Sequence, residues 1–305
     1  MSMQKSQVPG FYRLMIGECE VTALFDSAIQ FDTSIFKGFT DLGENEIKEM
    51  LDGDFVPHTA QGLYGGSLNA YLVNTGKHLI LVDAGIGETK SPVFIDKKGR
   101  LMENLEAAGY RAEDVDIVLP THLHFDHIAG VEANGEMCFP NATVYVEELE
   151  RQFWLQSSSE SIPENVLPFV EMARKSLRPY EKSGRVKFYH AGEEIFPYIK
   201  SVPLYGHTPG HTGFMVESEN EKLILFGDFV HIKSVQLTRP EICDIFDMDI
   251  DAVRKARFLG LAHFAEEKLM VAGAHFPFPG IGHIQKDSVG FRWFPIEYTH
   301  HYIDM

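Results

Sequence analysis

The sequence is poor in cysteine. Three cysteines, Cys19, Cys138 and Cys243, occur among 305 residues. Their odd number and wide spacing exclude a disulfide framework and a zinc knuckle. We therefore expect a reduced, cytoplasmic setting, with each cysteine acting as a small buried apolar side chain.

Positive charge is also scarce. There are 27 Lys and Arg against 44 Asp and Glu, which gives a formal net charge of −17. A field of this sign repels polyphosphates, and no Lys/Arg cluster stands out, so nucleic acid is not an expected partner and a nuclease is disfavoured.

Long hydrophobic runs are missing. The apolar runs at 79–82 and 223–226 are far shorter than a membrane span, so no membrane partner is expected. Residues 1–10 contain no apolar signal region, which again favours the cytoplasm, although a mature form that has lost its leader would read the same way.

Apolar and aromatic residues are plentiful, at 44% hydrophobic content with 23 Phe, which is ample for a large core. The length fits one large domain or two ordinary ones. Because no repeat and no Pro/Gly/Ser linker divides the chain, we predict a single domain over residues 1–305.

The hydrophobic pattern alternates between strand and helix periods, which favours an α/β class. Strands are predicted within 11–25 (a pair joined at Gly17-Glu18) and at 67–74, 78–82, 115–119, 140–146, 186–189, 200–204, 213–217, 222–226 and 269–275. Helices are predicted at 45–52, 99–110, 147–155 and 162–177, the last ended by Pro179, and at 248–259 with another to about 267.

Metal-ligating side chains crowd the segment after strand 115–119. Thr121 to His127 reads Thr-His-Leu-His-Phe-Asp-His. His122 and His124, two apart, point the same way on extended backbone, and Asp126 and His127 can then face a second ion. Because imidazole and carboxylate suit Zn²⁺ and other first-row ions, the string predicts a metal site.

Three other apolar strands also end in a potential ligand, namely His207, Asp228 and His275. Seven ligands exceed what one tetrahedral zinc uses, which implies two metal ions. Asp228 is the natural bridge between them.

Two further residues are candidates for a supporting role behind the ligands. Asp83 ends strand 78–82 and is interpreted as an acceptor that orients a metal histidine, with a simple turn-forming aspartate as the alternative. His211 is expected either to contact a ligand from behind or to have a purely structural role. Gly130 is expected to let the chain pass close to the site.

The seven ligand candidates resemble the pattern of the metallo-β-lactamase superfamily in its binuclear hydrolase branch. Asp228 stands where the zinc β-lactamases with a cysteine ligand have that cysteine, and His124 is not the Glu of the flavodiiron oxidoreductases. Within the branch, the chain resembles methyl parathion hydrolase and N-acyl-homoserine-lactonase-like enzymes. The strings that carry this resemblance lie at 139–142, 153–155, 206–212, 235–236 and 278–284, and the likeness runs from about Pro9 to Tyr298.

The resemblance implies a four-layer αβ/βα sandwich of the α/β class, with two metal ions at one end between its sheets. One ion would be held by His122, His124 and His207, the other by Asp126, His127 and His275, and both by Asp228. Zn²⁺ is the usual metal, with Mn²⁺, Co²⁺ or Fe²⁺ as substitutes. Homodimers are common in the branch, so a homodimer is a further expectation.

A water that bridges two divalent ions loses a proton near neutral pH and can attack a carbonyl carbon or phosphorus. Asp126 or Asp228 could then carry a proton to the leaving group. The small lactonases place a Tyr three residues after the bridging Asp, and here that position is His231, interpreted as a catalytic donor or as a polar residue of the pocket wall.

The aromatic pocket of methyl parathion hydrolase matches Trp154, Phe169 and, less closely, Phe94. Such a wall suits a hydrophobic substrate. We therefore predict a binuclear metal-dependent hydrolase of a hydrophobic lactone, ester or organophosphate triester. The alternatives are an iron-dependent oxidoreductase or dioxygenase on the same fold, and a non-catalytic protein with a structural metal.

Overall fold

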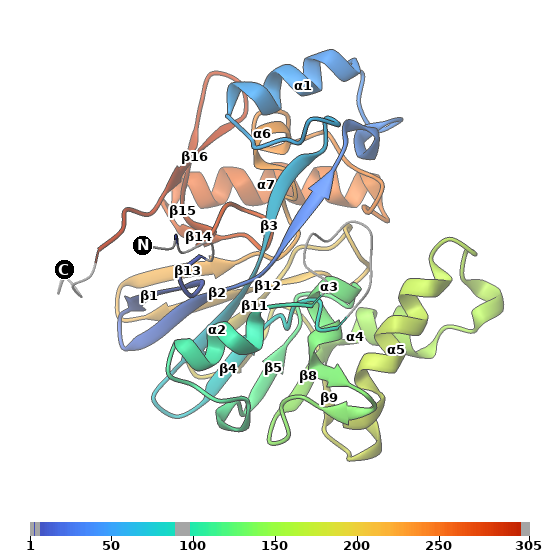
Figure 1. Cartoon of the computed structure of the whole chain (residues 1–305), viewed down its shortest axis with the longest axis vertical. Helices are drawn as coiled ribbons and strands as arrows, with labels where there is room; N and C mark the ends of the chain where they lie inside the picture. Colours follow the sequence, from blue (N-terminus) through green and yellow to red (C-terminus); the bar gives the residue numbers. More distant parts are fainter. Residues whose placement is uncertain (1–2, 4–6, 89–97, 300–305) are drawn as a thin grey trace.

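The computed structural model describes residue 3 and residues 7–88 and 98–299 of the chain. Phe94, a predicted pocket residue, lies outside the described residues. Within them, two seven-stranded mixed sheets form the centre of the molecule (Figure 1).

The first sheet has the strand order β1-β2-β3-β4-β5-β8-β9. Its strands are β1 Phe11–Ile16, β2 Cys19–Phe31, β3 Tyr64–Asn74, β4 Leu79–Val82, β5 Ile117–Leu119, β8 Thr143–Glu147 and β9 Val186–Tyr189. The second sheet runs from β10 to β16 in chain order. Its strands are β10 Glu194–Phe196, β11 Ile199–Pro203, β12 Thr212–Ser218, β13 Glu221–Leu225, β14 Met270–Ala272, β15 Ile281–Lys286 and β16 Phe291–Pro295. A separate short hairpin consists of β6 Glu132–Ala133 and β7 Glu136–Met137.

Helices lie outside these sheets. The α-helices are α1 Glu44–Gly53, α2 Leu101–Ala107, α3 Phe125–Ile128, α4 Glu148–Glu150, α5 Leu167–Lys182, α6 Lys233–Gln236 and α7 Ile250–Glu266. Shorter turns of helix are η1 Thr33–Phe36, η2 Ala112–Asp114, η3 Ala129–Val131 and η5 Ser159–Ser161, and η4 Arg151–Gln156 is a turn of π-helix that continues α4.

The alternation of side chains along each strand creates the layers. In β4, Leu81 faces the helices α2 and α5, whereas Ile80 and Val82 face the second sheet. In β13, Leu223 faces the first sheet and Ile224 packs toward α7. Each sheet is therefore apolar on both faces, and the predicted αβ/βα sandwich is confirmed.

Parallel pairing brings four strand ends to one edge. β4 runs parallel to β5 in the first sheet, and β13 runs parallel to β14 in the second. The carboxyl ends of parallel neighbours meet at the same edge of a sheet. The loops that carry His122–His127, Asp228 and His275 begin there. The loop of His207 begins at the same edge of the second sheet, because β11 and β13 both pair antiparallel with β12 and so run in the same direction.

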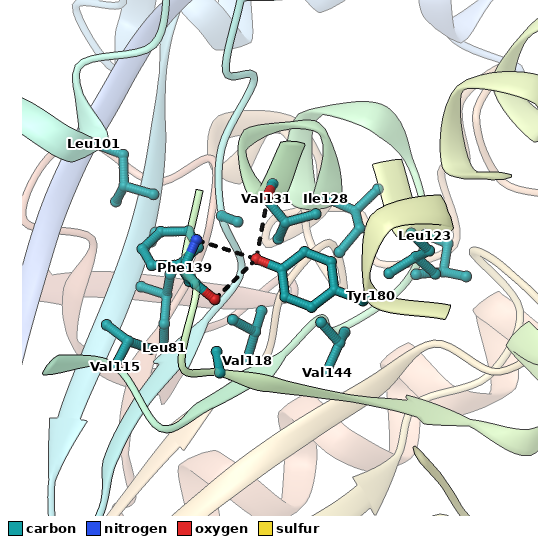
Figure 2. Packing of buried hydrophobic residues seen from close by; sticks show 14 of the residues in the cluster. Leu81, Leu101, Val115, Val118, Leu123, Ile128, Val131, Phe139, Val144 and Tyr180 are labelled. Atoms are coloured by element: carbon teal, nitrogen blue, oxygen red, sulfur yellow. Dashed lines mark hydrogen bonds between the residues drawn. The ribbon is translucent and has the colours of Figure 1, made fainter. Parts of the chain in front are cut away.

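The last turn of α5 differs from the prediction, because the helix continues through Pro179 to Lys182. Buried Tyr180 holds this turn in place (Figure 2). Its hydroxyl accepts from Phe139 N at 3.1 Å and lies 3.2 Å from the carbonyl oxygen of Val131. These tertiary bonds offset the hydrogen bond that proline removes.

Two other helix predictions also need correction. The predicted pair of helices within 248–267 is the single helix α7, Ile250–Glu266. The segment 147–155 forms only one turn of α-helix, α4, before the π-helical turn η4. A short hydrophobic pattern does not distinguish these cases, since tertiary packing decides them.

Cys19, Cys138 and Cys243 are free; Cys19 and Cys243 are buried as predicted, whereas Cys138 is only half-buried. Across the part of the chain that the structure describes, no helix combines the length and the apolar character that crossing a membrane requires.

Candidate metal centre

The loop after β4 supports the loop after β5. Asp83 has a positive φ of 62° and turns its carboxylate toward the next strand end. Thr121 donates its backbone N–H to Asp83 Oδ1 at 2.7 Å, and its hydroxyl also lies 3.1 Å from that carboxylate. Gly130 passes so close to Ala84 that a Cβ would collide with the carbonyl oxygen of Ala84, in agreement with the predicted close approach.

The seven predicted ligands come together as two overlapping clusters. In each cluster one donor atom from every residue lies within 4.8 Å of all the others. The first cluster is His122, His124, His207 and Asp228, and the second is Asp126, His127, Asp228 and His275. Among the described residues, Asp228 alone belongs to both, so its position is that of the predicted bridge.

The chemistry of the cluster fits divalent cations. Three buried atoms, His122 Nε2, His127 Nε2 and Asp228 Oδ1, have no hydrogen-bond partner. Asp228 Oδ1 nevertheless lies only 3.1 Å from both His127 Nε2 and His275 Nε2. Buried polar atoms without partners cost free energy, and lone pairs that face one another across such distances are suited to a shared cation.

Burial keeps several of these histidines neutral. It holds the pKa of His122 and of His207 well below the ordinary value and lowers the pKa of His124 to about 4. For Asp228, burial alone would raise the pKa, but the positive charges of His127 and His275 outweigh it and hold the pKa well below its ordinary value. Neutral imidazoles, as at these three histidines, and an ionised carboxylate are the forms that bind metal ions. Burial also lowers the pKa of His127, but the charges of Asp228 and Asp83 outweigh it and hold that pKa well above its ordinary value, so a bound cation would displace a proton there.

Buried carboxylates fix the orientation of two histidines among the ligand candidates. Asp83 Oδ2 lies 2.8 Å from His127 Nδ1, which is the kind of contact predicted for Asp83. Asp247 Oδ1 lies in the same way 3.0 Å from His207 Nδ1. Such contacts fix the tautomer and direct the other ring nitrogen toward the cluster.

His211 lies behind the cluster. Its Nδ1 is 3.0 Å from Leu204 O, and its Nε2 accepts from the backbone N–H of Asp228 at 3.1 Å. This contact positions the backbone of the candidate bridge, in line with the supporting role expected for His211.

His231 joins two carboxylates beside the cluster. Its Nε2 is 2.8 Å from Asp228 Oδ2, and its Nδ1 is 2.9 Å from Asp244 Oδ2. Burial alone would lower the pKa of His231, yet these two carboxylates hold it well above its ordinary value.

Sequence reasoning missed the groups behind His207 and His231. Asp247 is held by buried Arg257, whose guanidinium also donates to the carbonyl oxygens of Phe229 and Ile242. Buried Asp244 accepts from Gln236 at 3.0 Å as well as contacting His231. The only signal in the sequence was a pair of aspartates three apart, and a loop without hydrophobic periodicity does not indicate that they are buried.

A cavity of about 390 Å³ opens over the two clusters and has a predominantly apolar wall. Its lining residues are Ile29, Gln30, Phe31, Asp32, Ile35, Leu63, His124, Phe125, Asp126, Phe169, Asp228, His231, Ile232, Asp244, Ile245, Phe246 and His275. Phe169 and His231, which were predicted as pocket residues, are among them. Most of the other wall residues, from β2 to η1 and around Phe246, were not predicted.

Trp154 is a correction to the predicted pocket. It is fully buried in the core between the first sheet and α5, and it is not among the cavity-lining residues. Its ring packs edge-on against His124 with centroids 5.3 Å apart. The π-helical turn that carries Trp154 directs the indole inward, behind a ligand candidate instead of beside a substrate.

Clusters of histidine and aspartate that follow strand ends and lie under an apolar cavity are typical of metal-dependent α/β proteins. A family model described as the metallo-beta-lactamase superfamily matches residues 63–273. The chain belongs to this superfamily.

Curated relatives include N-acyl homoserine lactonases from a Bacillus species and from Bacillus cereus, 27% and 26% identical over 170 residues. Each match covers 51% of this chain and 60% of the relative, so the chain spans less than two thirds of those proteins.

Two solved structures resemble the chain over nearly its whole length. Hydrolase AbOPH of the beta lactamase superfamily is 34% identical with a TM-score of 0.88, and the match covers 96% of this chain and 100% of AbOPH. AidC, a dizinc quorum-quenching lactonase solved in complex with a product, is 28% identical with a TM-score of 0.84, at coverages of 95% and 99%. AbOPH and AidC are therefore both hydrolases by their names.

Proposed function

We propose that the chain is a binuclear metal-dependent hydrolase of a hydrophobic lactone, ester or organophosphate triester. The observation that carries this proposal is the set of partnerless buried atoms on His122, His127 and Asp228, directly beneath an apolar cavity. The likeness to a dizinc lactonase and to hydrolase AbOPH supports it.

The proposed ligand sets follow the two clusters. His122, His124 and His207 would hold one ion, Asp126, His127 and His275 the other, and Asp228 both. When bound, two divalent ions supply a water of lowered pKa and stabilise negative charge on a substrate oxygen. Zinc is the metal we expect, with manganese, cobalt or iron as substitutes.

The cavity wall would bind the apolar part of the substrate. Phe125 and Phe169 lie close to the first cluster, with ring centroids 5.8 Å apart, and Phe246 lies beside His231. No Lys or Arg occurs among the described lining residues, which favours an uncharged substrate.

Three polar groups face the cavity where the reacting bond would lie. His231 lines the cavity beside Asp228, and its Nδ1 is held by Asp244. Its Nε2 would hydrogen-bond a substrate or leaving-group oxygen by giving up its contact with Asp228 Oδ2. Asp126 and Asp228, which also line it, are the candidates for carrying a proton to the leaving group.

The test is a parallel assay of metal-replete protein with N-acyl-homoserine lactones, an aryl ester and a dialkyl aryl phosphotriester. Elemental analysis of the same sample counts the metal. We expect two divalent ions per chain and turnover of at least one class, which also identifies the substrate class. One iron per chain with oxygen consumption and no hydrolysis would replace this proposal with the oxidoreductase. Tightly retained metal without any turnover would favour a structural metal.

A further inference from the structure

Glu150 is a buried carboxylate that the proposed mechanism does not use. It ends α4 and is almost completely inaccessible. Burial raises its pKa to about 7 even though hydrogen bonds oppose that change. Burying a carboxylate without a cation is costly, so the contacts that Glu150 makes in return indicate its role.

Those contacts join two distant loops. Glu150 Oε2 accepts from the backbone N–H of Leu123 at 2.9 Å, and Oε1 accepts from the backbone N–H of Gly210 at 2.8 Å. Leu123 lies between the ligand candidates His122 and His124 in the first half of the chain. Gly210 lies three residues after His207 in the second half.

The three histidines beside these contacts belong to one cluster, His122, His124, His207 and Asp228. Neither contact involves the loop that carries His275, and His127 lies beyond Leu123 in helix α3. A carboxylate is required for this link because each of its oxygens accepts one N–H, whereas an amide offers one acceptor and directs its NH₂ toward the second donor.

Gly210 allows its loop to approach Glu150 closely. A Cβ on Gly210 would lie 2.7 Å from Glu150 N and 2.9 Å from Glu150 Cγ, so only glycine lets the loop come this close without a shift.

We propose that Glu150 is a positioning residue that holds the loops of His122–His124 and His207 together, and so sets the affinity of the first cluster for its ion without setting that of the second. This inference rests on the proposed function, because it assumes that both clusters bind metal.

The experiment is a titration of metal-free protein with Co²⁺ alone, followed by visible absorption and by elemental analysis. Glu150→Gln is compared with the wild type. The matched control is Glu132→Gln, because Glu132 is also a buried carboxylate that accepts from a backbone N–H, that of Gly135, and it contacts neither loop. His207→Ala and His275→Ala provide reference spectra for protein that lacks one ligand of the first or of the second cluster.

We expect Glu150→Gln to bind one Co²⁺ as the wild type does and the other roughly 10- to 100-fold more weakly. The spectrum of its tightly bound ion should match that of His207→Ala, while Glu132→Gln should titrate like the wild type. If Glu150→Gln does not fold, Glu150→Asp is measured in the same way. Its side chain is one methylene shorter and cannot reach both N–H groups, so the same selective weakening is expected.

Two tight Co²⁺ sites in the Glu150 variant would overturn the inference, and so would an equal loss in Glu132→Gln. A residual spectrum that matches His275→Ala would overturn it as well. The proposed function would stand in all three cases. It fails separately if the wild type itself binds fewer than two ions.

Discussion

The two sheets orient their ligand histidines in different ways. In the first sheet, Asp83 contacts His127 Nδ1 directly and also anchors Thr121, whose hydroxyl lies 3.1 Å from His122 Nδ1. In the second sheet, His207 depends on Asp247, which depends in turn on Arg257 of helix α7. The groups that orient the histidines of the first half therefore lie at strand ends, whereas those of the second half include a residue of an outer helix.

The two halves therefore depend on different parts of the fold to hold their histidines in place. Support by strand ends relies on the register of β4 and β5, which the hydrophobic core already fixes. Support through Arg257 relies on a buried guanidinium whose other bonds go to carbonyl oxygens of the loops around Phe229 and Ile242. Damage to α7 should therefore reach the metal centre, whereas damage to α2 should not.

Asp228 is common to both clusters, so changing it should have the largest effect. Asp228→Ala removes the one described residue that belongs to both clusters. We expect loss of both ions and a fall in turnover of roughly a thousandfold or more, because the ions supply the reactive water. Elemental analysis and the assay described above measure both. Two bound ions with full turnover would contradict the bridging position of Asp228.

The dependence of the second half on α7 predicts a large loss of stability in Arg257→Met. This variant leaves Asp247 and several buried carbonyl oxygens without a donor, so we expect a loss of about 3 kcal/mol in the free energy of unfolding. Urea denaturation in the presence of a chelator measures it without a contribution from metal binding. Arg292→Met is the control, since Arg292 pairs with Asp287 at an exposed position and should change stability by no more than about 0.5 kcal/mol. Equal losses in the two variants would remove the distinction between the halves.

The two orienting carboxylates allow a sharper comparison. Asp83→Asn should weaken both ions, because Asp83 serves His127 of one cluster and, through Thr121, His122 of the other. Asp247→Asn should weaken only the ion held by His207. We expect roughly 10- to 100-fold per affected ion, measured by Co²⁺ titration. Asparagine keeps the size of aspartate and tolerates the positive φ of Asp83, so the backbone should not move. Identical titration curves for the two variants would show that both halves are supported alike.

The sequence allowed the fold and the convergence of the ligand candidates to be predicted, because both follow from local patterns. The strands that precede His122, Asp228 and His275 are visible as apolar runs, and their convergence follows from the pairing of parallel strands. Asp244 and Asp247 were missed because their burial depends on Arg257 and on a loop without periodicity. Trp154 was misplaced because it was matched to the aromatic pocket of a resembling enzyme, whereas this chain buries the indole in the core beside α5. The homodimer and the single domain over residues 1–305 stay predictions.

The smallest expected effects concern the cavity wall, to which both halves of the chain contribute. Phe169 comes from α5 and Phe246 from the loop before α7, and both line the cavity. Phe169→Ala and Phe246→Ala should each raise KM by about tenfold for the substrate with the longest apolar group, and by less for a short one, with kcat nearly unchanged.

Trp154→Phe tests the corrected position of the indole. This variant creates a cavity in the core and should therefore lower the melting temperature, but the dependence of KM on substrate length should stay as in the wild type. If Trp154→Phe changed that dependence as much as the two alanine variants, the indole would contact substrate, and the wall would extend behind His124.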